Sequence, residues 1–365
     1  MGSIWGQHLK ISIFGESHGA GIGVVLDGLP SGHQLDLDKI QKFAQRRSPG
    51  RNAWSTPRQE ADQAEILSGV YKDRITGAPL AALIRNSDTR SADYDEARLK
   101  PRPGHADLTG MARYAGFQDP RGGGHFSGRL TAPLTFAGAL CSQILQTKGI
   151  RLACHIYEIA GISDKAFDAV QPDISLLTAL ADKVFPVLDD QAGEAMIEAI
   201  EAAHQNGDSV GGIVEAMIWG LPAGIGDPIF DGLESRLSSL IFGIPAVRGI
   251  EFGTGFAAAA MSGSAHNDVP VIQNQSIRFR TNHSGGIQGG ISNGMPLVFR
   301  VAFKPTPSIS KEQQTINLES MSEDTLAISG RHDPCIVPRA VPVVEAAAAV
   351  FALDVLLGAG IFQTV

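Results

Sequence analysis

The chain has 365 residues, of which 43% are hydrophobic and 19% are charged, a composition typical of soluble globular proteins with one large domain or two. Its formal net charge of −8 provides no overall attraction to nucleic acid or to an acidic membrane surface. The three cysteines are widely spaced without a C-x-x-C pair, and no secretory signal or uninterrupted apolar span is present, so we expect a cytoplasmic protein without disulfides, a zinc site or a membrane partner.

The first half of the chain alternates predicted strands and helices. The strands, read from short apolar runs, are Leu9–Phe14, Ile22–Leu26, Glu65–Val70 and Leu80–Arg85. The helices, read from apolar residues at helical spacing, are Leu37–Arg47 and Arg129–Lys148. Asp36 or Asp38 is expected to cap the first helix, and Thr76-Gly77 is expected to form the turn between the last two strands.

The second half shows the same alternation. Its predicted strands are Ile150–Ile159, Ile213–Trp219 and several short runs with glycine turns between Val269 and Phe303. Its predicted helices are Gln191–Gln205, Phe230–Ile241 and Pro342–Leu357. The last of these is strongly apolar but contains Glu345 and Asp354, so we interpret it as a buried helix.

Two stretches of the chain share one layout: a strand, a G-L-P-[SA]-G turn and a helix. Gly28-Leu29-Pro30 marks the first stretch and Gly220-Leu221-Pro222 the second. A G-L-P turn is common by itself, but the shared order favours an internal duplication. We therefore predict an α+β fold in which residues 1–365 form a single domain, with two pseudo-equivalent halves that each place helices against a mostly antiparallel sheet.

The stretch from Lys100 to Thr131 has the composition of an anion-binding site. It contains the cations Lys100, Arg102, Arg113, Arg121 and Arg129. Gly122–Gly124 has no Cβ atoms, so its backbone N–H groups can approach a ligand closely, and Ser127 is expected to cap the helix that follows. A glycine-rich turn before a helix N-terminus suits a phosphate or carboxylate. The alternative is a loop that needs positive φ angles, with solvated arginines.

Four histidines lie in polar loops that also contain Arg, Asp or Ser, and each is a candidate proton donor or acceptor near neutral pH. They are His18, His105, His125 and His332. His332 stands between Arg331, a candidate anion ligand, and Asp333, a candidate base. The segment Lys304–Ser308 (KPTPS) places a cation in a rigid turn that suits a phosphate or cofactor.

Other matches to catalytic or nucleotide-binding motifs are incomplete or lack the secondary structure that the motif requires. Gly15–Gly19 (GESHG) matches the nucleophile elbow G-x-S-x-G, which would make Ser17 the nucleophile of a hydrolase, but a β-rich run follows it where that motif requires a helix. No complete dinucleotide-binding G-x-G-x-x-G motif and no P-loop occur. A serine hydrolase therefore stays a minor alternative, beside a non-catalytic flavin- or phosphate-binding protein.

Five separated segments, in order, resemble the chorismate synthase family. They are Gly15–Pro30, the RPGHAD segment at Arg102, Gly124–Leu140, the KPTPS segment at Lys304 and Arg331–Ala347. The resemblance implies a carbon–oxygen lyase of the shikimate pathway. Such an enzyme converts 5-enolpyruvylshikimate 3-phosphate to chorismate by 1,4-elimination of phosphate and requires reduced FMN without net redox change. It also implies antiparallel sheets between helix layers and a homotetramer.

The resemblance also implies roles for individual residues. The substrate-binding residues are Arg46, Arg47, Arg102 and Arg129, and the catalytic residues are Ser17, His18, His105, Ser127 and Asp333. The flavin-binding residues are His125, Phe126, Ser127, Ala246, Gly289, Lys304, Pro305, Thr306, Pro307, Ser308 and Arg331. In these roles His105 neutralises the leaving phosphate, His18 gives a proton or hydrogen bond to the flavin, and Asp333 helps remove the ring proton. Ser17 and Ser127 orient these groups.

The loop after the first predicted helix departs from the family. The family often has cations where Ser48 and Ala53 stand, and its pyridine-nucleotide contacts fall at Arg47 and Ala53. We predict that Arg51 partly replaces the missing side chain at the substrate phosphate. No part of the chain is long enough for a separate reductase domain, so we expect an external flavin reductase or another NADPH-dependent source of reduced flavin.

Overall fold

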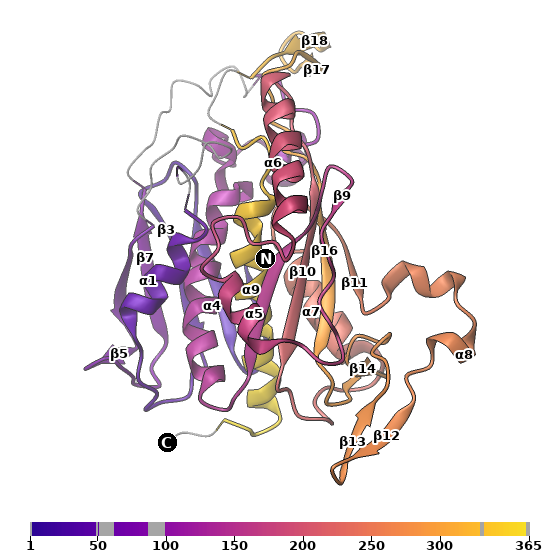
Figure 1. The fold of residues 1–365 in the computed structure, drawn as a ribbon. Coiled ribbons are helices and arrows are strands. Elements are labelled where there is room, and N and C mark those ends of the chain that lie inside the picture. The colour runs from indigo at the N-terminus through magenta and orange to yellow at the C-terminus, as the bar shows by residue number, and fades with distance from the viewer. Residues whose placement is uncertain (1, 49, 51–61, 87–98, 329–331, 363–365) are drawn as a thin grey trace.

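The computed structural model describes residues 2–48, 50, 62–86, 99–328 and 332–362. Its framework is a pair of five-stranded sheets in which every strand pair is antiparallel (Figure 1). The first sheet has the order β1 (Ile4–Trp5), β2 (Lys10–Gly15), β3 (Gly21–Asp27), β7 (Leu80–Arg85), β4 (Ala64–Ser68). The second has the order β11 (Val247–Phe252), β16 (Leu297–Phe303), β10 (Gly212–Trp219), β8 (Arg151–Ile159), β9 (Ile162–Ser163).

Helices fill the space between the two sheets. They are α1 (Leu37–Gln45), α4 (Thr131–Gln146), α7 (Leu233–Ile241) and α9 (Val337–Gly358). The α4 helix packs on β3 and β7, α9 packs on β8 and β10, and the two helices pack on each other. Their close approach requires Gly138, because a Cβ atom there would lie 2.2 Å from the Cα atom of Ala346. The expected mixture of helices and antiparallel sheets is confirmed, but the layers are sheet, helices, sheet, which corrects the expected order of sheets between helix layers.

The α9 helix is long and apolar enough to cross a membrane by length and composition, with a mean hydropathy of 2.1 in its most apolar window. In the fold, 94% of that window is buried against the protein itself. The helix is therefore the centre of the hydrophobic core, as Glu345 and Asp354 inside its apolar run suggested.

The two halves of the chain have the same sheet topology. The order β2-β3-β7-β4 in the first sheet corresponds to β8-β10-β16-β11 in the second, and α1 and α4 correspond to α7 and α9. The glycines that begin the two G-L-P turns directly follow β3 and β10, and both have positive φ angles, 97° at Gly28 and 87° at Gly220. This agreement supports our proposal that the halves are internally related.

Several element boundaries differ from the prediction for local reasons. The turn after β4 forms at Lys72-Asp73 between β5 (Val70–Tyr71) and β6 (Arg74–Ile75), because both residues take positive φ angles, 48° and 56°. The α9 helix begins five residues before Pro342, because Pro338 occupies its first turn. Asp36 does cap α1, accepting a hydrogen bond from the Lys39 N–H at 3.0 Å.

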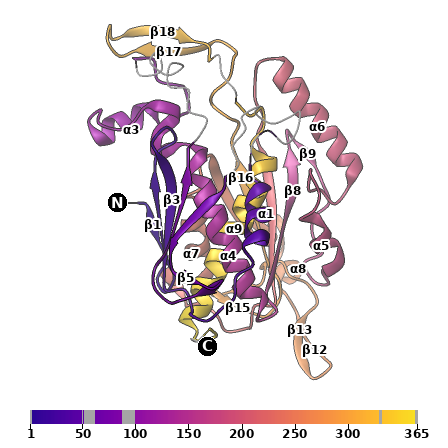
Figure 2. The ribbon, with the colours of Figure 1, turned by 90° about the vertical axis from the view of Figure 1, so that its left-hand side faces the viewer.

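The remaining elements lie outside this framework. The α5 (Ile174–Leu180) and α6 (Asp190–Gln205) helices cover the second sheet. An arm contains α8 (Gly263–His266), β12 (Pro270–Gln273) and β13 (Ser276–Phe279), and it projects from the molecule (Figure 1). The turn β14 (Ile287–Gln288) to β15 (Ile291–Ser292) precedes β16. At the upper end lie α3 (Asp107–Tyr114) and the hairpin β17 (Gln313–Asn317) to β18 (Ser322–Leu326), which were not predicted (Figure 2).

Candidate active site

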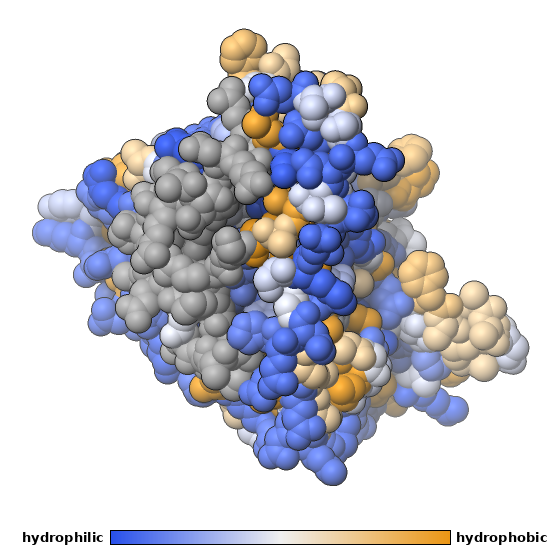
Figure 3. Space-filling model, turned by 90° about the horizontal axis from the view of Figure 1, so that it is seen from above, coloured by the Kyte–Doolittle hydropathy of each residue, from blue (hydrophilic) through white to orange (hydrophobic). Residues whose placement is uncertain are grey.

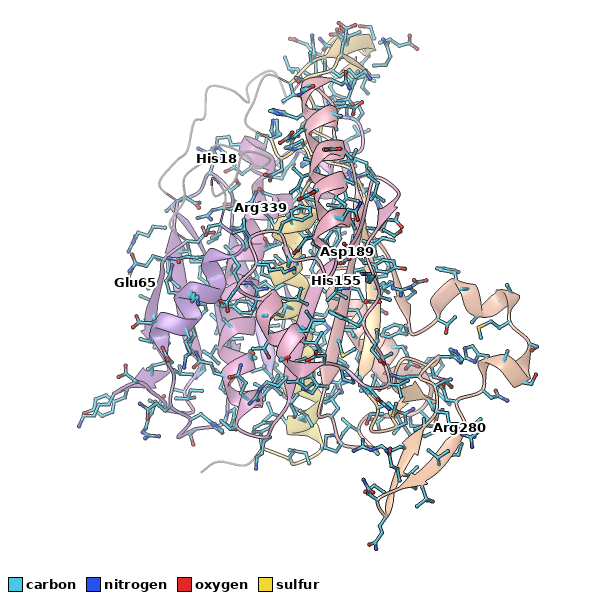
Figure 4. All side chains as sticks on the ribbon, in the orientation of Figure 1. His18, Glu65, His155, Asp189, Arg280 and Arg339 are labelled. Carbon is cyan, nitrogen blue, oxygen red and sulfur yellow. The ribbon has the colours of Figure 1, made fainter. Side chains whose placement is uncertain are left out.

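The residues that carry the family resemblance gather at the upper end of the molecule, where loops from both halves meet. Figure 4 shows His18 and Arg339 in this region, whereas His155 lies lower, in the second sheet. Seen from above, the described side chains beside this region are mostly hydrophilic (Figure 3). Described residues that follow β2, α1, β7 and β16 lie here, among them His18, Arg47, Asn86 and Lys304, so residues far apart in sequence share one site.

Two of the three glycines, Gly122 and Gly123, pack directly against two of the predicted histidines. Ser17 and His18 are buried in the short loop between β2 and β3, and the Ser17 N–H donates to the Gly124 carbonyl at 3.1 Å. A Cβ atom on Gly122 would fall 2.2 Å from His18 Nδ1, and one on Gly123 would fall 3.2 Å from His105 Nε2. The first distance leaves no room for a side chain at Gly122, whereas the second is a tight contact at Gly123. The positive φ angles of 59° and 83° favour glycine at both residues.

This loop also tests the hydrolase alternative. β2 and β3 form an antiparallel hairpin in which Gly15 pairs with Ile22. The nucleophile elbow requires a helix directly after the serine, and here a strand follows Ser17. The local fold therefore lacks the geometry on which that alternative depends.

His105 is oriented by a carboxylate. Its Nδ1 lies 2.6 Å from Asp107 Oδ1, and Arg102 donates to both oxygens of Asp107 at 2.7 Å. Burial alone would raise the pKa of Asp107, but the hydrogen bonds from Arg102 and His105 hold it well below its usual range. Arg102 also donates to Ser308 Oγ at 3.3 Å, so the predicted substrate cation is held between Asp107 and the KPTPS segment.

Two other predicted substrate cations share one buried carboxylate. Arg47 donates to Asp62 Oδ2 at 2.5 Å, and Arg129 donates to the other oxygen, Oδ1. All three side chains are at most 4% exposed. Although burial raises the pKa of Asp62, the charges of Arg47 and Arg129 outweigh it and lower that pKa. Arg47 is further fixed by Thr131 Oγ1 at 2.9 Å, and Arg129 by Asn86 Oδ1 at 3.2 Å.

The α9 helix supplies the remaining ionic contacts. Glu345 accepts from the Arg46 guanidinium at 2.9 Å. Arg339, in the first turn, donates through Nη1 to Asp333 and through Nε to the Arg47 carbonyl at 2.9 Å. Four guanidinium groups thus meet three carboxylates in a nearly dry region, where charges interact strongly.

Most of the predicted flavin-binding residues lie at the same end. Lys304 Nζ donates to the Gly104 carbonyl at 2.9 Å, and the Lys304 N–H donates to the Ala246 carbonyl at 3.0 Å. His125 contacts the Gly15 carbonyl at 2.8 Å through Nδ1 and Ser3 Oγ at 3.0 Å through Nε2. Burial and the charge of Arg248 lower the pKa of Lys304.

Two predicted residues take other positions. Ser127 Oγ accepts from the Arg129 N–H at 3.3 Å, so it caps the 3-10 turn Gly128–Leu130 that leads into α4. Gly289 lies in the β14–β15 turn, beyond the opposite end of β16 from Lys304. A seven-residue strand separates them, which is about 20 Å at 3.3 Å per residue. Arg331, Arg51 and Ala53 lie outside the described residues.

A cavity of about 220 Å³ opens between α3 and the glycine loop. Its walls include Met111, Phe126 and Leu318, with Gly123 at one side. Gln118 Oε1 is buried at this cavity and has no hydrogen-bond partner within the described residues. Asp107 and Asp119 also line the cavity. A mixed lining of this kind, with one unused acceptor, suits a flat heteroaromatic ring that carries an N–H group.

Comparison with known proteins identifies the family. A family model described as chorismate synthase matches residues 9–357. A chorismate synthase of Dehalococcoides mccartyi is 47% identical over 365 residues, covering 100% of this chain and 99% of the relative. One of Methanosarcina mazei is 46% identical over 359 residues, covering 98% of this chain and 97% of the relative. The chain belongs to the chorismate synthase family.

A solved structure described as a crystal structure of chorismate synthase has the same fold. The TM-score is 0.77 at 28% sequence identity, and the match covers 97% of this chain and 93% of that chain. The chain is therefore a carbon–oxygen lyase of the shikimate pathway, which forms chorismate from 5-enolpyruvylshikimate 3-phosphate with loss of phosphate. The chorismate synthase family uses reduced flavin.

Sequence reasoning missed four charged residues of this site. They are Asp62, Asp107, Arg339 and Glu345. Three of them carried a usable signal, since Asp107 belongs to the RPGHAD segment, Arg339 belongs to the Arg331–Ala347 segment and Glu345 interrupts an apolar run. Asp62 carried none, because Arg47 and Arg129 are brought near it only by the tertiary structure.

Proposed function

We propose that this enzyme holds reduced FMN beside the glycine loop, against the cavity walls and the KPTPS segment. The cavity supplies Phe126 and the acceptor Gln118, and the KPTPS segment supplies the cation Lys304. Thr306 Oγ1 is also buried without a hydrogen-bond partner in the part of the chain that the structure describes, which fits a polar cofactor group. The resemblance adds His125, Ser127, Ala246, Gly289, Pro305, Pro307, Ser308 and Arg331. When bound, reduced flavin would supply the electron density that eases C–O cleavage without net redox change.

The arginine cluster is proposed to bind the substrate. This substrate carries one phosphate and two carboxylates, and guanidinium groups bind such oxygens with two parallel hydrogen bonds. Asp62 and Glu345 hold Arg46, Arg47 and Arg129 in place before the substrate arrives. Arg102 is the fourth proposed cation, and its contacts with Asp107 and Ser308 place it beside His105.

The packing of two histidines on adjacent glycines is the observation that carries this proposal. Gly122 and Gly123 hold His18 and His105 at one loop, close to the arginine cluster. His105, oriented by Asp107, would donate to the leaving phosphate and neutralise its charge. His18 would give a proton or a hydrogen bond toward the flavin, with Ser17 beside it.

Asp333 is proposed as the carboxylate that helps remove the ring proton. It is 9% exposed and paired with Arg339, so the site holds it in one orientation. A carboxylate held in this way can accept a proton once the substrate excludes water. Ser127, which caps the turn before α4, would keep the Arg129 backbone in place.

An anaerobic assay of phosphate release tests the proposed function. Purified enzyme, 5-enolpyruvylshikimate 3-phosphate and chemically reduced FMN should release phosphate and form chorismate, and omission of either the flavin or the reductant should stop the reaction. Oxidised FMN provides the matched control. Phosphate release that is independent of flavin, or its absence with all components present, would contradict the proposal.

We further propose a homotetramer. The outer face of the first sheet exposes Phe14 at 41% and Leu67 at 57%, and the arm exposes Phe256 at 86% and Ile272 at 77%. Apolar side chains are visible at the arm in Figure 3. If Gly289 contacts flavin, a second copy must supply it, because Lys304 of the same chain is too far away. Light scattering should give four times the chain mass of 38.5 kDa.

The source of reduced flavin is proposed to be external and the location cytoplasmic. Arg47, the expected pyridine-nucleotide contact, is bound to Asp62, Thr131 and the Gly128 carbonyl in the described part of the chain. A flavin reductase with NADPH should therefore support turnover, whereas NADPH alone should not. Turnover with NADPH and FMN but no reductase would contradict this expectation.

A further inference from the structure

Arg339 connects two parts of the site that belong to different halves of the molecule. Its Nη1 donates to the Asp333 carboxylate, and its Nε donates to the Arg47 carbonyl at 2.9 Å. Asp333 belongs to the segment between β16 and α9, whereas Arg47 follows α1. The Arg339 side chain thus links the Asp333 loop to the end of α1 through two hydrogen bonds.

The position of Arg339 in its helix argues against a purely structural role. It lies in the first turn of α9, where the helix dipole disfavours a positive charge. Asp36 illustrates the usual choice at a helix start, since this carboxylate caps α1. Arg339 therefore destabilises the start of α9, and its contacts with Asp333 and the Arg47 carbonyl must offset this cost.

The shape of the guanidinium group explains why an arginine serves here. Nε and Nη1 lie in one rigid plane, so one side chain can hold a carboxylate and a carbonyl in a defined relative position. A lysine has a single flexible ammonium group and cannot reproduce both contacts at these positions. Arg339 is 21% exposed as a side chain, so its contacts are largely shielded from water.

We propose that Arg339 is a positioning residue for the elimination, which fixes the Asp333 carboxylate and the Arg47 backbone relative to each other. This inference rests on the proposed roles of Asp333 as proton acceptor and of Arg47 as substrate-binding cation. Loss of Arg339 should let the two loops separate, so that the proton acceptor and the bound substrate lose their alignment. Misplacement of this kind reduces kcat far more than it reduces folding.

The charged and titratable groups around Asp333 come from several segments of the chain. Arg339 faces it from α9. Arg47 and Asp62 lie beyond Arg339, since Arg339 binds the Arg47 carbonyl and its charge acts on Asp62. Cys335 lies close enough for Asp333 to act on its thiol. The role of the Arg339 contact is therefore best tested by substituting this side chain and measuring kcat and substrate affinity.

The test compares Arg339→Met and Arg339→Lys with Arg236→Met as a matched control. Arg236 pairs with Asp354 at the other end of the same helix, and its side chain is 10% exposed. Arg339→Met should lower kcat about 10²-fold, the usual cost of misplaced reacting groups. Arg339→Lys keeps the positive charge but not both contacts, so kcat should stay reduced. Arg236→Met should lower the Tm without a comparable loss of kcat.

A double-mutant cycle and a binding measurement complete the test. In an Asp333→Asn background, Arg339→Met should reduce kcat by less than about threefold, because residues that act as one unit are not additive. Calorimetry should show weaker binding of 5-enolpyruvylshikimate 3-phosphate to Arg339→Met, by about fivefold or more, the loss expected when a charge-assisted contact is misplaced. If Arg339→Met keeps wild-type kcat and substrate affinity while only the Tm falls, the inference is wrong. Failure of the wild-type enzyme to release phosphate would instead overturn the proposed function, and the binding comparison would still decide the role of Arg339.

Discussion

Gly122 lies so close to the imidazole of His18 that a Cβ carbon on this glycine would fall 2.2 Å from Nδ1. Any side chain larger than that of glycine would therefore clash with His18 at the first position of the three-glycine run. The same glycine has a φ angle of 59°, so two independent constraints meet at one residue. Separating these constraints is possible with matched substitutions.

We expect Gly122→Ala to lose about 10²-fold in kcat, because the new methyl group displaces His18. Gly149→Ala is the control, since Gly149 has a φ angle of 76° and a methyl group there would meet no atom within 4 Å. Both variants should lose about 1–2 kcal/mol of stability from the left-handed backbone. Thermal unfolding and phosphate-release kinetics distinguish the two effects, and equal kcat values in the two variants would contradict a steric role for Gly122.

His105→Ala should slow phosphate release by about 10²–10⁴-fold, the usual worth of a general acid or base. Asp107→Asn should cause a smaller loss, because the imidazole remains but its orienting carboxylate, 2.6 Å from Nδ1, is neutralised. His204→Ala, on the exposed surface of α6, is the control. Turnover of the His105 variant within threefold of wild type would remove the leaving-group role.

Asp62→Ala should destabilise the fold by about 3–5 kcal/mol, because it leaves the buried Arg47 and Arg129 guanidinium groups without their shared carboxylate. Substrate affinity should fall as well, since the two cations lose their fixed geometry. Glu65→Gln removes the exposed partner of Arg85 and should cost less than about 1 kcal/mol. Urea unfolding of both variants measures the difference, and similar losses would show that Asp62 is not a structural bridge.

The buried His155 should make stability depend on pH. Burial lowers the pKa of His155, but its hydrogen bonds to Asp164 and Glu215, both 3.0 Å, outweigh this and raise that pKa above the ordinary value of 6.5. The folded state thus favours the protonated imidazole. Its contribution is complete below pH 6.5 and is lost as the pH rises through the raised folded value.

His155→Ala should therefore cost about 3–5 kcal/mol at pH 6, because the buried Asp164 loses its cation and the buried Glu215 keeps only Arg300. The penalty relative to wild type should shrink at pH 9. Urea titrations of both proteins at the two pH values measure this change. A penalty that grows with pH would mean that His155 is neutral in the folded protein.

Flavin and substrate should bind cooperatively, because both are proposed to contact the loop that runs from Gly122 to Arg129. Calorimetry of FMN binding should show higher affinity with 5-enolpyruvylshikimate 3-phosphate present than without it, and the substrate should gain affinity from FMN by the same factor. Equal FMN affinities under the two conditions would contradict a shared loop.

Local patterns in the sequence were sufficient to place most elements and the family motifs. The strands β2, β3, β8 and β10, the α6 helix and the two G-L-P turns follow from apolar spacing and from glycine at positive φ angles, which depend on residues only a few positions apart. The same short-range signals singled out the histidines His18 and His105 and the glycine run. Residues within one motif remain close in any fold that forms the motif, so they can be recognised without knowledge of the tertiary structure.

The partners of the charged residues were decided only by the tertiary structure. Arg339 and the Arg47 carbonyl are 292 positions apart, and Arg129 and Asp62 are 67 apart. No periodicity encodes which arginine meets which carboxylate, because these contacts form only in the folded chain. Arg339 meets Arg47 where the two halves pack together, whereas Asp62 meets Arg47 and Arg129 within the first half. Tertiary packing also places the helices between the two sheets. The sequence alone therefore determined the family and the chemical groups, and the tertiary structure determined how those groups are paired, oriented and buried.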